Sequence, residues 1–559
     1  MTSKPVPRRL LLVVLLVPVL VAPVRADAAA EPGLPALHAT TGAGARIEDE
    51  LGRTVLLRGI NVNQLAEYAQ NHPGFATTLQ LTEADFAGIA ALGFDVVRLL
   101  VSWSRLEPTP GAFDEAYVDR VREAIGWASD HDLYVIVDMH QDAWGSSVGT
   151  PTTETCLPGF EPAIGWDGAP AWATITDGLP TCAGAGVREL SPAVAQAWTS
   201  FYLDRSGIQT HLVDTWGRLA AAVAAEPNVI GWDLLNEPNP GLATIGTSDV
   251  VLLGAFYDRA LDAIRAGERT AGVAPRIGFW EPPAEWSLLG VSPVPLPGFT
   301  DQPNLVFAPH VYAGSLSPLV TPAQGHDLAT AVAALHGTTY FSGEWGWFGD
   351  PATDGVQVAA YAAEEDRRLV GGAWWSWKQA CGDPHVIGGR GKEPGAISPS
   401  LVRIGCPGDV ELGPPPPFAT VLSRAYPRAA PGRLTAVSSD AATGSLTATG
   451  EAPGATGAAA ELDLWIPDRG LGRPVVAGVQ VVDPEVVEVE GGWRVEATAS
   501  GSWRVDVHPG GATPSEGGSA APVSGPTLPI TGGADPVVWP VLALAVLLLV
   551  RWSTLQRWG

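Results

Sequence analysis

The sequence predicts an α/β protein in which a (β/α)8 TIM barrel is followed by a small C-terminal β-sandwich. The first observation is that eight short apolar runs alternate with longer helical patterns between residues 35 and 427, which is typical of a parallel barrel. The second is that residues 428–508 are rich in Thr, Val and Gly and contain period-two runs such as Val487-Glu488-Val489-Glu490. Such alternation between turn signals is typical of a β-sandwich.

The barrel prediction depends on the number of apolar runs rather than on any one of them. A single short run does not distinguish a buried strand from a buried helix, whereas eight runs at workable spacing favour a barrel. Thr82-Glu83-Ala84-Asp85 indicates a helix start between two runs, and Gly93 indicates its end. The runs expected to form strands are residues 55–60, 96–101, 134–138, 229–235, 276–280, 305–308, 339–342 and 372–377.

Composition and charge limit the classes of function. The 559 residues include 33 Lys and Arg against 59 Asp and Glu, which gives a formal net charge of −26. A phosphate-binding face needs clustered positive charge, so no nucleic-acid partner is expected. Hydrophobic residues make up 46% of the chain, which permits a large core and excludes wholesale disorder.

Both ends of the chain carry targeting patterns. Residues 1–28 are typical of a secretory signal peptide, with basic residues, an apolar stretch and the small-residue site Ala26-Asp27-Ala28; an uncleaved membrane anchor is the alternative. Residues 509–527 are rich in Gly, Pro and Ser and are expected to form a flexible stalk. Residues 528–559 contain an apolar segment, 536–550, followed by a basic tail. That segment is short for an independent membrane-spanning helix.

The four cysteines of the chain are typical of an exported protein with disulfide bonds. Cys156, Cys182, Cys381 and Cys406 allow three pairings. Pairing within each half, Cys156 with Cys182 and Cys381 with Cys406, is the simplest and would close two long loops. No CxxC spacing is present, so no zinc site is expected.

Polar residues gather where the predicted barrel strands end, and a barrel holds its active site at that rim. Two of these residues, Glu237 after the fourth run and Glu344 after the seventh, are carboxylates. Glycoside hydrolysis needs one carboxyl group to protonate the leaving oxygen and another to attack the anomeric carbon. A separation of about 5 Å gives retention of configuration, and the reaction needs neither metal nor cofactor. The remaining polar and aromatic residues at strand ends are Arg98, Asp138, His140, Asp142, Asn236, His310, Tyr312, Trp375 and Trp377.

Two sequence runs resemble the catalytic signatures of glycoside hydrolase family 5, a family of retaining barrels. They are Trp232-Asp233-Leu234-Leu235-Asn236-Glu237-Pro238 and Ser342-Gly343-Glu344-Trp345-Gly346. The resemblance implies that Glu237 is the general acid/base and Glu344 the nucleophile. It also implies supporting roles at six further positions. Asn236 would bind the sugar 2-hydroxyl, Tyr312 would orient the nucleophile, His310 would contact the acid/base, Arg98 would support Glu344, Trp375 would form the sugar platform, and His140 would be a further supporting residue.

A narrower resemblance concerns the endoglycoceramidase branch of that family. Residues 137–142, 168–180 and 423–429 resemble that branch. The resemblance implies cleavage between the glycan and the ceramide of a glycosphingolipid, with Asp138 binding the glucose or galactose next to ceramide. The loop 61–75 lacks the lysines of several branch members, so the glycolipid series stays open. The alternatives are a retaining β-glucanase or mannanase acting on polysaccharide, and a wall-anchored adhesin that binds glycans.

The C-terminal segment resembles the sortase sorting signal of Gram-positive bacteria. Leu528-Pro529-Ile530-Thr531-Gly532 precedes the apolar segment and the basic tail. The resemblance implies cleavage between Thr531 and Gly532, with sortase as a partner; a plain membrane anchor is the alternative. The expected protein is therefore a secreted monomer attached to the wall or surface of a Gram-positive cell.

Overall fold

The structure, a computed structural model, describes residues 1–2, 34–243, 246–452 and 460–510. The predicted sorting signal lies outside these residues, as do almost all of the predicted signal peptide and of the predicted stalk. Across the described ranges, we find no helix with the length and apolar character that crossing a membrane requires.

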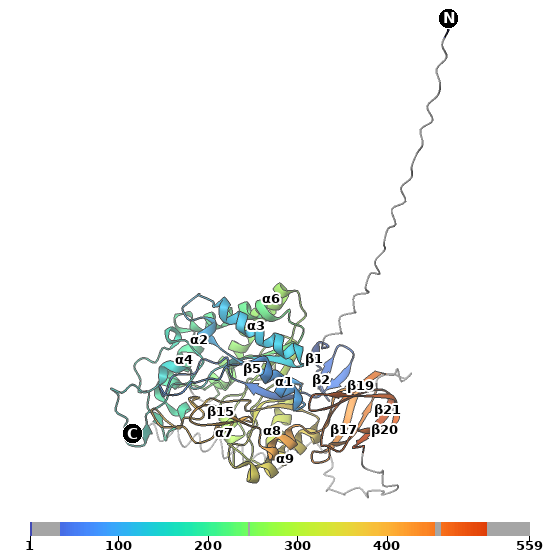
Figure 1. Cartoon of the computed structure of the whole chain (residues 1–559). Coiled ribbons are helices and arrows are strands. Elements are labelled where there is room, and N and C mark those ends of the chain that lie inside the picture. The colour runs from blue at the N-terminus through green and yellow to red at the C-terminus, as the bar shows by residue number, and fades with distance from the viewer. Residues whose placement is uncertain (3–33, 244–245, 453–459, 511–559) are drawn as a thin grey trace. The chain divides into compact units, whose positions relative to one another are not determined.

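Eight parallel strands form a nearly closed barrel (Figure 1). Their order is β11, β10, β9, β6, β5, β4, β13, β12, and a single parallel bridge between Phe307 and Tyr340 joins the two ends. Each predicted run overlaps one strand of the barrel, with bounds that shift by at most three residues, so the TIM-barrel prediction is confirmed. The strands are β4 (Arg58–Val62), β5 (Val96–Ser102), β6 (Tyr134–His140), β9 (Val229–Asp233), β10 (Ile277–Trp280), β11 (Leu305–Phe307), β12 (Phe341–Trp345) and β13 (Gly371–Trp374).

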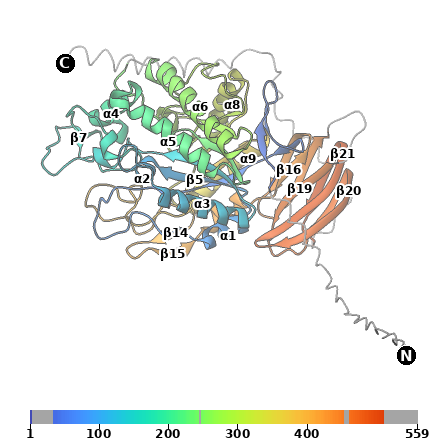
Figure 2. The ribbon, with the colours of Figure 1, turned by 90° about the horizontal axis from the view of Figure 1, so that it is seen from above.

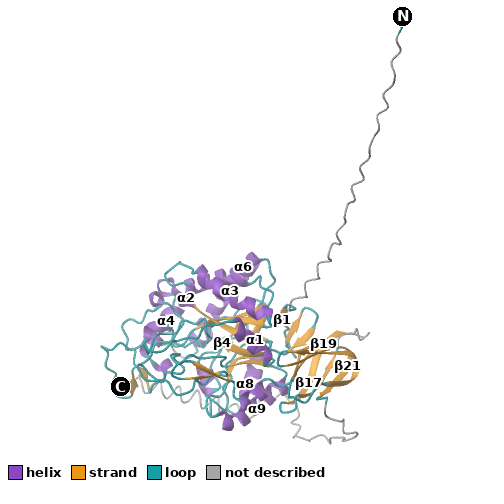
Figure 3. Ribbon diagram, viewed as in Figure 1, coloured by secondary structure: helices purple, strands orange, loops and turns teal. Residues whose placement is uncertain are grey.

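Helices lie around the outside of the barrel (Figure 3). The predicted start at Thr82 is correct: Asp85 accepts a hydrogen bond from the Thr82 backbone amide at 2.9 Å, and Gly93 follows the helix end with a φ of +80°. The α-helices are α1 (Glu83–Ala91), α2 (Trp103–Leu106), α3 (Glu115–Asp130), α4 (Pro192–Tyr202), α5 (Ile208–Val223), α6 (Leu253–Ala271), α7 (Glu285–Leu289), α8 (Pro322–Leu335), α9 (Pro351–Arg368) and α10 (Pro416–Leu422). Short 3-10 or π segments are η1 (Ser146–Val148), η2 (Ala171–Ala173), η3 (Arg188–Leu190), η4 (Arg205–Gly207) and η5 (Ser248–Leu252).

A second, antiparallel sheet of nine strands contains the C-terminal region (Figure 2). Its first three strands come from residues 37–55, inside the range 35–427 that the sequence assigns to the barrel, and Val55 pairs with Ala429. That this region folds as a sandwich stays a prediction. The strands are β1 (Leu37–Ala39), β2 (Ile47–Asp49), β3 (Arg53–Val55), β16 (Tyr426–Pro431), β17 (Arg433–Asp440), β18 (Ser445–Glu451), β19 (Ala460–Pro467), β20 (Val475–Val489) and β21 (Gly492–His508).

Two disulfides close loops on the barrel. Cys156 bonds Cys182 and Cys381 bonds Cys406, so the disulfide prediction is confirmed with the two local pairs. The first loop holds β7 (Phe160–Glu161), which pairs with β8 (Ala183–Gly184) just beyond Cys182. The second holds β14 (Arg403–Gly405), which pairs with β15 (Val410–Gly413) beyond Cys406. Residues from both loops line the site described below.

A buried charge cluster lies where the barrel meets the segment leading into β16. Asp366 on α9 accepts hydrogen bonds from Arg58 on β4 at 2.7 Å and from Arg424 at 2.9 Å. Arg424 also donates to Glu365 at 2.8 Å. The two guanidinium groups neutralise the two carboxylates, so the cluster links three parts of the chain that are far apart in sequence.

Replacing Asp366 by alanine should reduce the free energy of unfolding by about 3–5 kcal/mol, because it leaves buried guanidinium groups short of a partner. Urea denaturation followed by circular dichroism measures this. Asp119→Ala is the control, because Asp119 pairs with Arg122 on the exposed face of α3 and such pairs contribute about 1 kcal/mol or less. Equal effects of the two substitutions would contradict a structural role for the cluster.

Candidate active site

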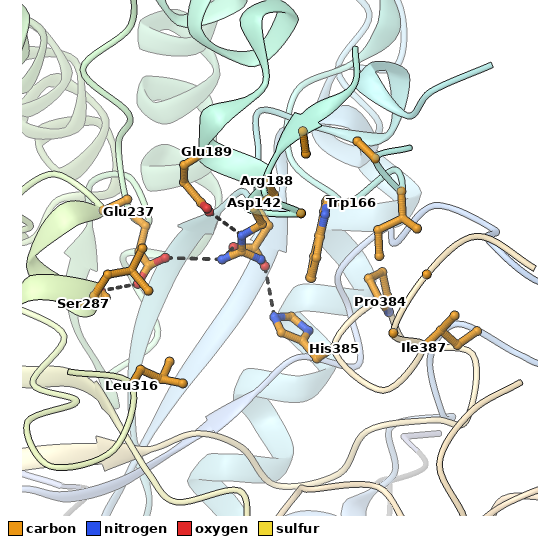
Figure 4. Close-up of a pocket in the computed structure, with 18 of the residues that line it drawn as sticks. Asp142, Trp166, Arg188, Glu189, Glu237, Ser287, Leu316, Pro384, His385 and Ile387 are labelled. Carbon is orange, nitrogen blue, oxygen red and sulfur yellow. Dashed lines mark hydrogen bonds and ion pairs between the residues drawn. The ribbon is translucent and has the colours of Figure 1, made fainter. Parts of the chain in front are cut away.

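A pocket of about 650 Å³ opens at the C-terminal ends of the barrel strands (Figure 4). Glu237 and Glu344 both line it, together with Asn236, His140 and Tyr312. Trp375, which directly follows β13, also lines it. The rim that the sequence indicates is therefore where the structure places these side chains.

The two candidate catalytic carboxylates face one another. One oxygen of Glu237, one oxygen of Glu344 and a ring nitrogen of His310 all lie within 4.8 Å of each other. Carboxyl groups about 5 Å apart are suited to direct attack on an anomeric carbon, whereas inverting enzymes need more than about 6.5 Å to admit a water molecule. The spacing therefore fits a retaining mechanism.

Both oxygens of Glu344 accept hydrogen bonds from buried donors. Arg98 on β5 donates to Oε1 at 2.9 Å, and the Tyr312 hydroxyl donates to Oε2 at 2.8 Å. His310 Nδ1 lies 3.4 Å from Oε2. These contacts fix the orientation of the carboxylate toward the pocket, which is what a nucleophile requires.

Glu237 is held differently, with close contacts at Oε1 and a longer one at Oε2. Its Oε1 accepts a hydrogen bond from the Ser287 hydroxyl and contacts His310 Nδ1 at 2.9 Å. The backbone of Glu237 has a φ of +38°, in the left-handed region, and its N–H donates to Glu281 at 2.8 Å. Oε2 faces the pocket, where Arg188 Nη2 lies 3.4 Å away.

Arg98 is fully buried at the centre of a polar network. Besides Glu344, its guanidinium contacts Asp138 at 3.0 Å, Asp233 at 2.8 Å and Glu281 at 2.8 Å. It also donates to the side-chain oxygen of Asn236 at 3.0 Å. Four carboxylates around one guanidinium fix the strand ends relative to one another, which holds the site in a single arrangement.

Other predicted residues are held by contacts with one another and with the backbone. Asp138 Oδ2 contacts His140 Nδ1 at 2.8 Å, and the His140 ring stacks on Trp375 with 5.4 Å between ring centroids. The Asn236 amide donates to the backbone oxygen of Gln141 at 2.9 Å. Asp138 is fully buried and is absent from the pocket lining, so in this structure it acts on His140 and Arg98.

The two carboxyl groups differ in pKa. Burial raises the pKa of Glu344, and the positive charges of His310 and Arg98 oppose it. Burial also acts to raise the pKa of Glu237, but His310, followed by Arg188, outweighs burial and lowers it. Burial acts to lower the pKa of His310, yet the carboxylates of Glu281 and Glu344 raise it well above its ordinary value. The positive charge of His310 therefore favours the carboxylate form of Glu237.

Comparison with known proteins gives the family. The model of the family described as cellulase (glycosyl hydrolase family 5) matches residues 49–380. The chain belongs to this family. The match spans β3 to the end of the barrel strands and includes both candidate catalytic carboxylates, so the family resemblance seen in the sequence is confirmed.

Individual relatives of this family 5 chain carry related names. A crystal structure of an endogalactoceramidase is 45% identical, with 85% of this chain and 100% of that chain covered and a TM-score of 0.78. Endo-glycoceramidase II from Rhodococcus sp., solved as a lactosyl-enzyme intermediate, is 26% identical over 83% of this chain and 99% of that chain, with a TM-score of 0.63. Endoglycoceramidase I of Rhodococcus hoagii (strain 103S) is 31% identical over 48% of this chain and 52% of the relative. The chain thus spans about half the length of the curated relatives it matches.

Several residues of this family 5 site were missed in the sequence. Glu281 directly follows β10 and binds Arg98, His310 and the Glu237 backbone; the rule that strand ends carry the site was sufficient to find it. Arg188 and Ser287 lie in η3 and α7, outside the strand ends, and no motif marks them. Only the folded chain brings them to Glu237.

Proposed function

We propose that this family 5 protein is a retaining endo-β-glycosidase that hydrolyses the bond between the oligosaccharide and the ceramide of glycosphingolipids. The observation that carries the proposal is the facing pair Glu237 and Glu344, with oxygens within 4.8 Å, in a chain 45% identical to a protein described as an endogalactoceramidase. The lactosyl-enzyme intermediate of the Rhodococcus sp. relative supports a covalent mechanism for this chain as well.

The chemistry would follow two displacements. In the first, a Glu344 oxygen attacks the anomeric carbon, the bond from that carbon to the ceramide oxygen breaks, and Glu237 gives its proton to that oxygen. In the second, Glu237 takes a proton from water, the water oxygen attacks the anomeric carbon, and the bond to Glu344 breaks. The sugar leaves with its original configuration, and both carboxyl groups return to their starting state.

The pocket lining supports a lipid-linked substrate. Leu288, next to Ser287 in sequence, and Leu316 both line the pocket, and Figure 4 shows Leu316 on the same side of the pocket as Glu237 and Ser287. Both leucines are more than 40% exposed and would contact the apolar leaving group, because the acid/base must lie beside the bond that breaks. Trp166 and His385 line the opposite side (Figure 4), where an aromatic face and a polar ring are suited to sugars. We propose that this side receives the glycan.

The sugar next to ceramide is the finer question, and we propose galactose. The support is the name, endogalactoceramidase, of the relative that is 45% identical and covered along its full length. The test incubates the protein with two glycosphingolipid sets, one with galactose and one with glucose linked to ceramide, alongside soluble glucans and mannans. Mass spectrometry should detect intact oligosaccharide and free ceramide, with the galactose-linked set cleaved at least about tenfold faster, equivalent to about 1.4 kcal/mol in transition-state binding.

The same panel separates the alternatives. Release of sugar from glucan or mannan alone would replace this proposal with a polysaccharide hydrolase. Binding of glycolipid without any cleavage would favour an adhesin. Neither alternative is favoured: the relatives named above are enzymes of glycolipids, and the catalytic pair is complete.

We further propose that the chain is exported, joined by sortase to the cell wall of a Gram-positive bacterium at Thr531, and active as a monomer. Two disulfides support export, because such bonds persist in oxidising compartments. A single chain supplies all the site residues named here, which supports a monomer. Fractionation of cell walls after Thr531→Ala, with size-exclusion chromatography of the released protein, tests both points.

We also propose that the C-terminal sheet closes into a sandwich that supports the barrel. The first half of β21 pairs with β19 and the second half with β18, with Gly501 between them. Leu446 of β18, Leu464 of β19 and Val505 of β21 belong to one buried cluster, which supports two sheet halves facing each other.

A further inference from the structure

Arg188 joins three parts of the candidate active site. It lies on η3, just after the loop closed by the disulfide between Cys156 and Cys182. Its side chain is 22% exposed and lines the pocket. Figure 4 shows it between Glu237 on one side and Trp166 on the other.

The contacts of Arg188 fix both the position and the charge of its guanidinium. Nη2 contacts Asp142 at 2.6 Å and Glu237 Oε2 at 3.4 Å. Nε pairs with Glu189 at 2.5 Å. The Arg188 Cζ atom lies 4.2 Å from the centre of the Trp166 ring, a cation–π geometry.

The contact with Oε2 matters because this is the oxygen that is free to deliver a proton. Ser287 and His310 already contact Oε1 of Glu237. The proton that Glu237 transfers to the leaving oxygen must therefore reside on Oε2. Arg188 stands beside that oxygen without displacing it from the pocket.

We propose that Arg188 is a positioning residue. It holds Oε2 of Glu237 beside the bond that breaks, and its contacts with Asp142 and Trp166 connect this oxygen to the side of the pocket that receives the glycan. This inference rests on the proposed function, in which Glu237 is the acid/base. Arg188 acts through Glu237 in both displacements. Its positive charge opposes protonation of the Glu237 carboxyl group before the first displacement, and it favours the carboxylate that acts as the base in the second.

The direction of its effect follows from the charges around Glu237. Arg188 and His310 are the positive groups near it, and removing Arg188 takes away one of the two influences that lower the pKa of Glu237. The pKa of Glu237 then rises, because burial and neighbouring carboxylates remain. The other ionisable groups that face Glu237 are Asp142 after β6, Glu189 on η3, Glu281 after β10, Glu285 on α7, Tyr312 after β11 and Glu344 on β12.

The experiment compares Arg188→Gln with the wild-type protein over a range of pH. With a glycosphingolipid in detergent, the alkaline limb of kcat/KM reports loss of the proton from Glu237 and should move up by about one pH unit, the size of shift typical of a nearby opposite charge. With a dinitrophenyl β-glycoside, the first step needs no acid, so the acid limb of kcat reports Glu237 as base and should move up similarly. Arg188→Lys keeps the charge and should restore both limbs toward their original positions.

Controls separate this role from general damage. Arg205→Gln removes a surface arginine that pairs with Asp177 at 2.6 Å and should leave both limbs unchanged. Arg188→Met keeps an unbranched side chain against Trp166, so it gives the same test if the glutamine variant does not fold, as judged by thermal unfolding. Unmoved limbs in a folded Arg188→Gln or Arg188→Met protein would overturn the inference. Full activity of Glu237→Gln would instead overturn the acid/base assignment beneath it.

Discussion

Replacing Glu344 by alanine is expected to lower kcat by about 10⁴-fold or more, because no covalent intermediate can form without the nucleophile. The effect should be equally large for a glycosphingolipid and for a dinitrophenyl glycoside, since both need attack on the anomeric carbon. The variant should still fold: Arg98 keeps Asp138, Asp233 and Glu281 as partners. Steady-state kinetics on both substrates, with thermal unfolding as the check on folding, measures this.

Azide provides a sharper test of the same residue. In the Glu344→Ala protein a small anion has room to attack the anomeric carbon directly, in one displacement. The product should be a glycosyl azide of inverted configuration, which nuclear magnetic resonance identifies. Retained configuration would mean that another nucleophile acts, and a similar loss in Glu123→Ala, a change on the exposed face of α3, would mean that the effect is not specific.

Replacing Glu237 by glutamine is expected to lower the rate on glycosphingolipids by about 10²–10⁴-fold, the range for loss of general acid–base catalysis. Glutamine keeps the shape and can still meet Ser287 and His310, but it has no proton to give to the ceramide oxygen. A dinitrophenyl leaving group needs no proton, so its first step should stay close to the wild-type rate while the second step slows.

Pre-steady-state kinetics checks this asymmetry between the steps. The Glu237→Gln protein should release a burst of dinitrophenol equal to the concentration of active sites, followed by slow turnover. Absence of a burst together with normal hydrolysis of glycosphingolipid would contradict the acid/base role. Comparison with Glu344→Ala, which should show no burst, assigns the two carboxylates to different steps.

The barrel could be predicted from the sequence because each of its strands is buried on both faces. Such strands give apolar runs, broken only by Arg98 in residues 96–101 and by Asp138 at the end of residues 134–138, and their ends point to the site. Residues 37–55 carried no comparable signal. Their three strands are only three residues long each. The pairing of β3 with β16 joins segments more than 370 residues apart, such as Val55 with Ala429, which no local pattern encodes.

The site could be predicted as far as it lies on strand ends. Glu237, Glu344, Arg98, His310 and Tyr312 are brought together around the pocket in the arrangement that the motifs suggest. Arg188 and Ser287 come from loop segments, and their place beside Glu237 depends on how those segments pack. Loops that carry function are fixed by tertiary contacts rather than by periodicity, so sequence patterns do not reveal them.

Cleavage of a glycosphingolipid in water enriched in oxygen-18 tests the proposed reaction most directly. Mass spectrometry of both products should find one heavy oxygen in the intact oligosaccharide and none in the free ceramide, because water attacks the anomeric carbon of the Glu344 adduct. Heavy oxygen in the ceramide, or release of single sugars in place of the intact oligosaccharide, would contradict the account.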